Sequence, residues 1–140
     1  MRQTLRTERL VAEPLVAEHA RLLFSELRNE NLYRYIPQDP PVDLEAVESR
    51  FQRLAAYPHS PDGSELWLNW VTRERSTSTY VGTLEASVTP GQEAVIAYFV
   101  FERHQRMGYA KEGVGALLDY LFEHHGVRSE ERRVGKECRL

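Results

Sequence analysis

The sequence predicts a single α+β domain whose elements follow the order β-α-α-β-β-β-α. Apolar residues recur at helical spacing in three runs, and three strand-like stretches rich in β-branched and aromatic residues lie between the second and third run. Short segments rich in Pro, Gly, Ser and Thr separate these runs, and none is long enough to link two domains. The 140 residues, of which 41% are hydrophobic, are sufficient for one buried core.

The first half of the chain predicts one strand and two helices. Residues 9–16 are a short apolar stretch interrupted by Pro14, which predicts an edge strand because proline cannot donate to a neighbouring strand. An amphipathic helix ends near residues 28–31, and Asp43 is placed to cap a second helix that stops at the prolines and glycine of residues 57–64. The apolar faces of the two helices consist of Val16, Ala20, Leu23, Phe24 and Leu27, and of Leu44, Val47, Phe51, Leu54 and Ala55.

The second half predicts three strands followed by a helix. The strands are expected at residues 65–73, 79–88 and 93–101. The turn at residues 89–92 contains a Pro-Gly pair suited to a tight hairpin. The last helix is expected at about residues 109–125, with apolar residues on one face.

Composition excludes several classes of protein. The formal net charge is −3 and the basic residues are scattered among acidic ones, so the chain lacks the basic surface that nucleic-acid binding requires. No apolar run approaches the roughly 20 residues of a membrane helix, and the N-terminus lacks the apolar core of a signal peptide. We therefore expect a cytoplasmic protein. The single cysteine, Cys138, permits neither an internal disulfide nor a cysteine-based metal cage, and we expect no metal site.

The segment with the clearest chemical meaning is residues 104–115, "HQRMGYAKEGVG", which joins the last strand to the last helix. A helix that begins directly after a strand presents unpaired amides and the positive end of its dipole, and small residues there let an anion approach the main chain. Arg106 and Lys111 flank the turn and are suited to phosphate contacts. The segment lacks the lysine and Ser/Thr of a P-loop, and "GYAKEG" is not a dinucleotide-binding GxGxxG.

A purely structural explanation of this segment stays open at this point. In that explanation, the sole role of Gly108 is to permit a positive φ at the turn, and Gly113 and Gly115 allow the helix to pack closely on the sheet. His104, beside the turn, is either a phosphate contact or a solvated loop residue.

The same residues resemble the signature of the GCN5-related N-acetyltransferases (GNAT), Q/R-x-x-G-x-G/A, which residues 105–110 match. The opening "TERLVAEPL" at residues 7–15 and the turn "GYAKEG" are similar to the branch that acetylates ribosomal-protein N-termini. The resemblance covers residues 7–127 and implies a three-layer fold with a mixed, mainly antiparallel sheet flanked by helices. Glu102 departs from the family pattern, which commonly has proline there.

The resemblance implies a site for acetyl-CoA, the acetyl donor. Its pantetheine arm would pair with main-chain groups of Phe99, Val100 and Phe101, and a primary amine would attack the thioester directly while the Val100 amide stabilises the oxyanion. The acceptor would be a protein N-terminus or a small-molecule amine, and the acidic balance of the chain favours a cationic one. The residues expected to bind the pyrophosphate are Gln105, Arg106, Met107, Gly108, Tyr109, Ala110 and Lys111.

Glu85 is the first candidate for the general base. It alternates with Thr83 and Ser87 along its strand, which predicts a polar face directed at the substrate. The same alternation is typical of the solvated face of an antiparallel sheet, so this alternative stays open. Glu102 is the second candidate, and residues 32–37, "LYRYIP", occupy the region that shapes the acceptor pocket in the family.

The last residues have a different character. Residues 128–139 lack apolar periodicity and, translated back into codons, resemble a common sequencing adapter. We expect residues 1–127 to be an incomplete N-acetyltransferase domain and residues 128–140 a non-native tail. The C-terminal strands and helix of the fold would then be absent, the strand at residues 93–101 would keep an unpaired edge, and activity would be impaired. A non-catalytic module that binds acyl-CoA or a phosphate ligand, or an inactive fragment, is the alternative; a monomer and a homodimer are both compatible with the sequence.

Overall fold

A six-stranded sheet forms the centre of the molecule. The computed structural model describes residues 3–34, 39–127 and 129–132. The strands lie in the order of the sequence, and each pair of neighbours is antiparallel except β5 and β6, which run parallel. They are β1 (Leu5–Arg6), β2 (Leu10–Pro14), β3 (Leu66–Glu74), β4 (Tyr80–Val88), β5 (Glu93–Val100) and β6 (Ser129–Arg132).

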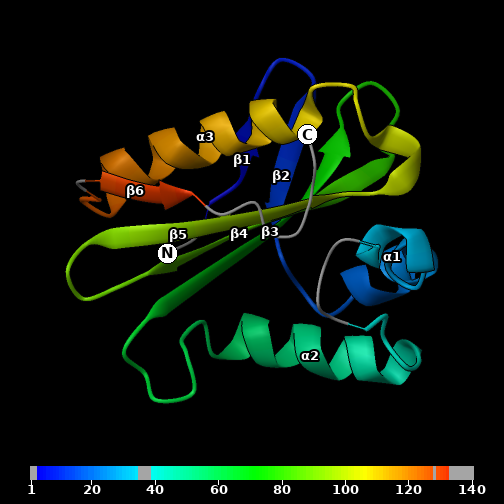
Figure 1. The fold of residues 1–140 in the computed structure, drawn as a ribbon, viewed down its shortest axis with the longest axis horizontal. Helices are drawn as coiled ribbons and strands as arrows, with labels where there is room; N and C mark the ends of the chain where they lie inside the picture. The colour runs from blue at the N-terminus through cyan, green and yellow to red at the C-terminus, as the bar shows by residue number, and fades with distance from the viewer. Residues whose placement is uncertain (1–2, 35–38, 128, 133–140) are drawn as a thin grey trace.

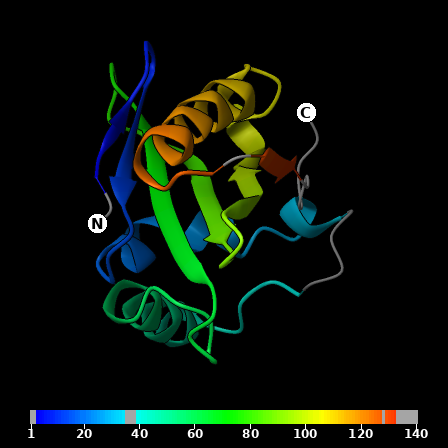
Figure 2. The same cartoon turned by 90° about the vertical axis from the view of Figure 1, so that its left-hand side faces the viewer.

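Helices cover both faces of the sheet. Helix α3 (Tyr109–His124) packs on one face, and α1 (His19–Leu27) and α2 (Leu44–Ala56) lie on the other (Figures 1 and 2). Two short 3₁₀ turns, η1 (Glu30–Tyr33) and η2 (Glu102–His104), follow α1 and β5. The expected three-layer arrangement with a mixed, mainly antiparallel sheet is confirmed.

The core under α3 is the larger of the two. Trp70, Ile96 and Leu117 are fully buried there, and the Trp70 ring meets Tyr120 edge-to-face with 5.4 Å between ring centroids. Gly113 lies where α3 crosses β4, because a Cβ added to it would lie 3.3 Å from Leu84. The predicted packing role is confirmed for Gly113.

The same prediction is wrong for Gly115. This residue is exposed, and a Cβ added to it would meet no atom within 4 Å. The helical period explains the difference, because residues two positions apart, such as Gly113 and Gly115, lie on different faces of a helix. Packing therefore gives no reason for glycine at this position.

The second core lies between the sheet and the α1–α2 layer. Leu23, Phe51, Val71 and Phe101 are among its most buried members. Asp43 adopts extended backbone and accepts a hydrogen bond from the Ala46 amide at 2.8 Å, so the predicted cap of α2 is confirmed.

One expectation about strand edges is wrong, and a second is wrong in part. The strand with Pro14 is not at the edge, because β1 pairs with its residues Val11 and Ala12; Pro14 lies past the end of β1 and needs no donor on that side. At the other end of the sheet, β6 pairs with β5 over Glu93 to Ile96, so this part of the edge is covered. The pairing ends at Ile96, and the origin of residues 128–140 stays a prediction.

Candidate functional site

The turn into α3 has the backbone that an anion site needs. Gly108 precedes the helix with a φ of +82° and Arg106 has a φ of +68°, so the chain turns sharply between β5 and α3. The first backbone bond of the helix runs from the Glu112 amide to the Gly108 carbonyl at 3.1 Å. The amides of residues 109–111 therefore have no acceptor within the helix, and the positive end of its dipole lies there.

The side chains of this turn fall into two groups. Tyr109 and Ala110 are buried against the sheet, so only their main chain faces the turn. Exposed side chains are those of Gln105, Arg106, Met107 and Lys111. Two of these four carry a positive charge, which suits a phosphate group at the helix N-terminus.

Arg9, which the sequence did not single out, holds the turn to β2. Its Nη1 donates to the Met107 carbonyl at 2.9 Å, and its guanidinium lies 4.5 Å from the centre of the Tyr109 ring. Its Nε and main-chain N–H donate to the Glu112 carboxylate at 2.7 and 2.8 Å, and the Thr7 hydroxyl donates to the same carboxylate. The only signal for this contact was the "TER" opening at residues 7–9, which carried the family resemblance.

These contacts neutralise the acidic residue in the first turn of α3. Burial alone would raise the pKa of Glu112, but the hydrogen bonds from Thr7 and Arg9 outweigh burial and lower it. The carboxylate is therefore ionised and paired with Arg9, so its repulsion of a phosphate at the turn is reduced.

Tyr109 and His104 lie behind the turn. The Tyr109 hydroxyl donates to the Glu74 carboxylate, and this bond, together with burial, raises the pKa of Tyr109. The His104 ring lies 6.5 Å from the Tyr109 ring, and its buried Nε2 has no hydrogen-bond partner among the described residues. A phosphate contact from His104 stays a prediction.

At the end of β5, Val100 is placed differently from its two neighbours. The Phe101 amide donates to the Val81 carbonyl at 2.8 Å, and the Phe99 carbonyl oxygen lies 2.1 Å from where a Cβ on Gly82 would be. Main-chain groups alternate in direction along an antiparallel strand, so the Val100 amide points to the opposite edge.

This alternation corrects part of the predicted pantetheine site. Phe99 and Phe101 direct their main chains at β4, and the Phe101 carbonyl also accepts from the His104 amide at 2.8 Å. Of the three predicted residues only Val100 turns its amide to the outer edge, while its carbonyl accepts from Gln105 Nε2 at 2.9 Å. The correction needed the register of β4 and β5, which spacing in the sequence does not give.

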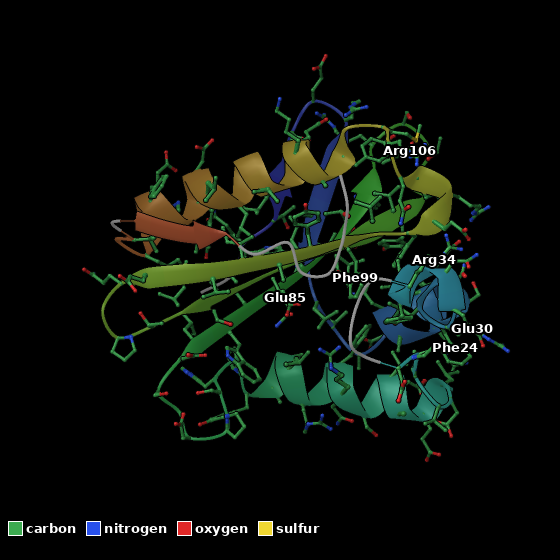
Figure 3. The ribbon with its side chains drawn as sticks, viewed as in Figure 1. Phe24, Glu30, Arg34, Glu85, Phe99 and Arg106 are labelled. Atoms are coloured by element: carbon green, nitrogen blue, oxygen red, sulfur yellow. The ribbon has the colours of Figure 1, made fainter. Side chains whose placement is uncertain are left out.

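Glu85 lines a cavity between the sheet and α2. The cavity has a volume of about 360 Å³ and extends from α2 to Phe99 near the end of β5. Figure 3 shows Glu85 on the α2 side of the sheet, in the space between the strands and that helix. The polar residues that line this cavity include Asp39, Arg50, Asn69, Thr83 and Glu85. The predicted polar face of β4 is confirmed, while the role of Glu85 as a base stays a prediction.

A second cavity continues along the same face of the sheet. It has a volume of about 450 Å³ and shares Arg50, Leu54, Asn69 and Glu85 with the first. Ser87 lines this second cavity, so all three alternating polar residues of β4 face the α2 side. Asn69 lies directly across from Glu85 on β3.

Residues from the segment between α1 and α2 contribute to the first cavity in part. Tyr33 lines it, and its hydroxyl donates to the Leu27 carbonyl at 2.7 Å; burial raises the pKa of Tyr33. Tyr35 and Ile36 of the predicted acceptor region lie outside the described residues.

Glu102, the second candidate base, is held by two amides. Asn29 Nδ2 donates to one of its carboxylate oxygens at 2.6 Å, and Asn31 Nδ2 donates to the other at 3.0 Å. Because both oxygens are engaged and the residue lines neither cavity, the structure favours a role in joining η2 to η1.

The described part of the chain contains no group of three or more His, Cys, Asp or Glu residues arranged to hold a metal ion. No helix in the described ranges has the length and apolar character needed to cross a membrane.

Comparison with known proteins connects these features to a family. A sequence model of the acetyltransferase (GNAT) domain matches residues 9–135. The uncharacterised N-acetyltransferase YoaA of Bacillus subtilis (strain 168) is 26% identical over 125 residues, which are 88% of this chain and 68% of that protein.

Two solved structures share the fold. A GNAT-family acetyltransferase from Bacillus anthracis has a TM-score of 0.76 at 15% identity, over 93% of this chain and 72% of its own. RimL, a ribosomal L7/L12 alpha-N-protein acetyltransferase in complex with coenzyme A, has a TM-score of 0.79 at 15% identity, over 93% of this chain and 73% of its own. Because the family match spans most of the chain and includes the turn into α3, this protein belongs to the GNAT family of N-acetyltransferases, which transfer acetyl groups from acetyl-CoA to amines.

Proposed function

We propose that this protein acetylates a primary amine bound in the cavity beside Glu85, by direct attack of the amine on the thioester of acetyl-CoA. The observation that carries the proposal is the position of Glu85. Its carboxylate lines the cavity that reaches Phe99 near the end of β5, and it has no hydrogen bond or ion pair among the described residues. It is therefore available to an incoming amine.

The turn into α3 would hold the donor. The unpaired amides at residues 109–111, with Arg106 and Lys111 on the surface, would bind the pyrophosphate of acetyl-CoA. The thioester would lie next to Val100, whose amide points to the outer edge of β5. This placement puts the reacting carbonyl between the donor turn and the cavity.

The chemistry then needs one base and one oxyanion donor. Glu85 accepts a proton from the ammonium group, directly or through a water molecule, and the free amine attacks the thioester carbonyl carbon. The Val100 amide stabilises the negative oxygen that forms. The C–S bond breaks as the amide bond forms, the nitrogen loses its second proton, and coenzyme A leaves as a thiolate that takes up a proton. No covalent enzyme intermediate is required.

The acceptor is an amine of one of two kinds. A protein N-terminus and a small-molecule amine both fit a cavity of this size, and likeness in fold to RimL supports the first.

A test compares Glu85→Gln with the unchanged chain in assays of acetyl-CoA binding and of thiol release with amine acceptors. Loss of a general base should lower kcat by roughly 10²-fold or more and leave the Kd of acetyl-CoA unchanged. Glu123→Gln, which removes an exposed carboxylate of α3, is the matched control and should behave like the unchanged chain. A kcat of Glu85→Gln equal to that of the unchanged chain would show that Glu85 is not the general base. Tight acetyl-CoA binding without thiol release for any amine would instead favour a binding module.

A further inference from the structure

The two cavities on the α2 face differ in charge. The first is lined by the carboxylates of Asp39 and Glu85 and by one guanidinium, Arg50. The second is lined by two guanidinium groups, Arg50 and Arg53, and by Glu85 alone among the carboxylates. A ligand that spans both cavities therefore meets a more acidic end near β5 and a more basic end farther along α2.

Helix α2 places the two arginines on one side. Arg50 and Arg53 are three positions apart, and Leu54, four positions after Arg50, lines the same cavity. Residues at this spacing share a face of a helix, so both arginines, which are also exposed to solvent, line the cavity along β3 and β4.

Neither arginine has a charged partner in the described part of the chain. Ion pairs hold the guanidinium groups of Arg9, Arg21, Arg73 and Arg103, but no such pair involves Arg50 or Arg53. No guanidinium nitrogen of Arg50 lies within 4.0 Å of a carboxylate oxygen of Glu85, although both residues line both cavities. Opposite charges that face one space without meeting leave room for a ligand carrying both charges.

We infer that the acceptor carries an anionic group near its amine, and that Arg50 and Arg53 bind this group while Glu85 receives the amine. The inference rests on the proposed function and names its substrate class. Arginine suits a carboxylate because its N–H groups match the two oxygens. Asn69 and Ser87, which also line the second cavity, supply polar contacts between the two charged ends.

This substrate class differs from the one that net charge favours. The chain is acidic overall, which favours a cationic acceptor, but a specific site responds to the charges that line it. Two sources supply the shared chemistry: a free amino acid, with its own carboxylate, and a peptide N-terminus followed by an acidic residue.

The test measures thiol release at saturating acetyl-CoA for two matched pairs of probes, with calorimetric binding as a second readout. Seryl-aspartate amide is compared with seryl-asparagine amide, and free serine with serinamide. We expect one charged probe to exceed its neutral partner in kcat/KM and in affinity by about tenfold, the worth of a hydrogen bond to a charged group. The pair that shows the preference identifies the source of the carboxylate.

Variants test whether the preference for charged probes arises from the arginines of the cavity. Arg50→Gln and the double change of Arg50 and Arg53 to Gln should remove it. Arg6→Gln, which removes an exposed arginine of β1 that lines neither cavity, should keep it. Equal results for charged and neutral probes, no binding of any probe, or a preference that survives the double change would each overturn the inference.

The two proposals fail in different ways. Thiol release with equal rates for all probes would overturn the anionic acceptor and leave acetyl transfer standing. Calorimetric binding of a charged probe that depends on Arg50, without any thiol release, would support the anionic site and overturn catalysis by this chain.

Discussion

Three glycines of this chain differ in whether their surroundings require glycine. Gly82 lies under the Phe99 carbonyl, since a Cβ there would lie 2.1 Å from that oxygen. Gly108 needs its positive φ of +82°. Gly115 has open space around it and lies inside α3, where glycine is less favourable than alanine.

This difference predicts opposite effects of one substitution on stability. Gly82→Ala should lower the free energy of unfolding by about 1–3 kcal/mol, because the Phe99 carbonyl belongs to the backbone and cannot move aside freely. Gly115→Ala should raise it by about 1 kcal/mol through helix propensity. Urea denaturation followed by circular dichroism measures both, and a stable Gly82→Ala would mean that β4 and β5 separate more easily than their register indicates.

At the scale of elements, one carboxylate joins β2, β3, β4 and the start of α1. Glu13 of β2 accepts hydrogen bonds from Arg73 Nε at 2.7 Å, from the Tyr80 hydroxyl at 2.9 Å and from His19 Nε2 at 3.1 Å. His19 Nδ1 accepts from the Val16 amide, so its hydrogen is on Nε2 and the ring donates to Glu13. The cluster therefore holds the start of α1 against the ends of these strands.

The cluster predicts a loss of stability in acid. Burial raises the pKa of Glu13, but the bonds from Arg73, His19 and Tyr80 outweigh burial and lower the pKa below its ordinary value of 4.5. The resulting stabilisation is present above pH 4.5 and disappears as the pH falls through the lowered pKa. Glu13→Gln should be less stable at neutral pH and should depend less on pH in this range. Denaturation midpoints between pH 3 and pH 7, taken at roughly one-unit steps, measure the slope, and equal slopes for both chains would contradict this account.

At the scale of the whole molecule, the elements that could be predicted are those whose pattern lies within one segment of the sequence. Residues recurring at helical and strand periods located three helices and strands β3, β4 and β5, and a short apolar stretch located β2. The glycine at position 108 indicated the positive φ of the turn before α3. Strand β1 was missed because two residues cannot display a period. Strand β6 was missed because its charged residues show no alternation, and its pairing depends on the edge of β5.

The candidate site was predictable only in part, for a related reason. Glu85 followed from alternation along its own strand. The contact between Arg9 and Glu112 joins positions 103 residues apart, and the place of Arg50 in the lining of the cavity depends on where α2 lies over the sheet. Contacts of this kind arise from tertiary packing, which the pattern of a single segment does not contain.

Binding of the donor should stabilise the whole fold. Acetyl-CoA at about 100 times its Kd adds about 2.7 kcal/mol to the free energy of unfolding if it binds only the folded chain. Gly108→Val should abolish most of this gain, because valine strains a φ of +82° and a Cβ there would lie 3.2 Å from Arg9 Nη2. Thermal denaturation with and without acetyl-CoA measures the shift; an equal shift in Gly108→Val would exclude the α3 turn as the binding site.

The bonds from Asn29 and Asn31 to Glu102 join the segment that follows β5 to η1. Glu102 lies between the end of β5 and the donor turn, while the two asparagines flank the start of η1, whose Tyr33 lines the acceptor cavity. Thermodynamic linkage then requires that coenzyme A and acceptor change each other's affinity by one common factor. If acetyl-CoA and the acceptor bind where we propose, Glu102→Ala should bring this factor towards one while leaving each separate affinity nearly unchanged. Calorimetric titration of each ligand with and without the other measures the factor, and an unchanged factor in Glu102→Ala would contradict this role.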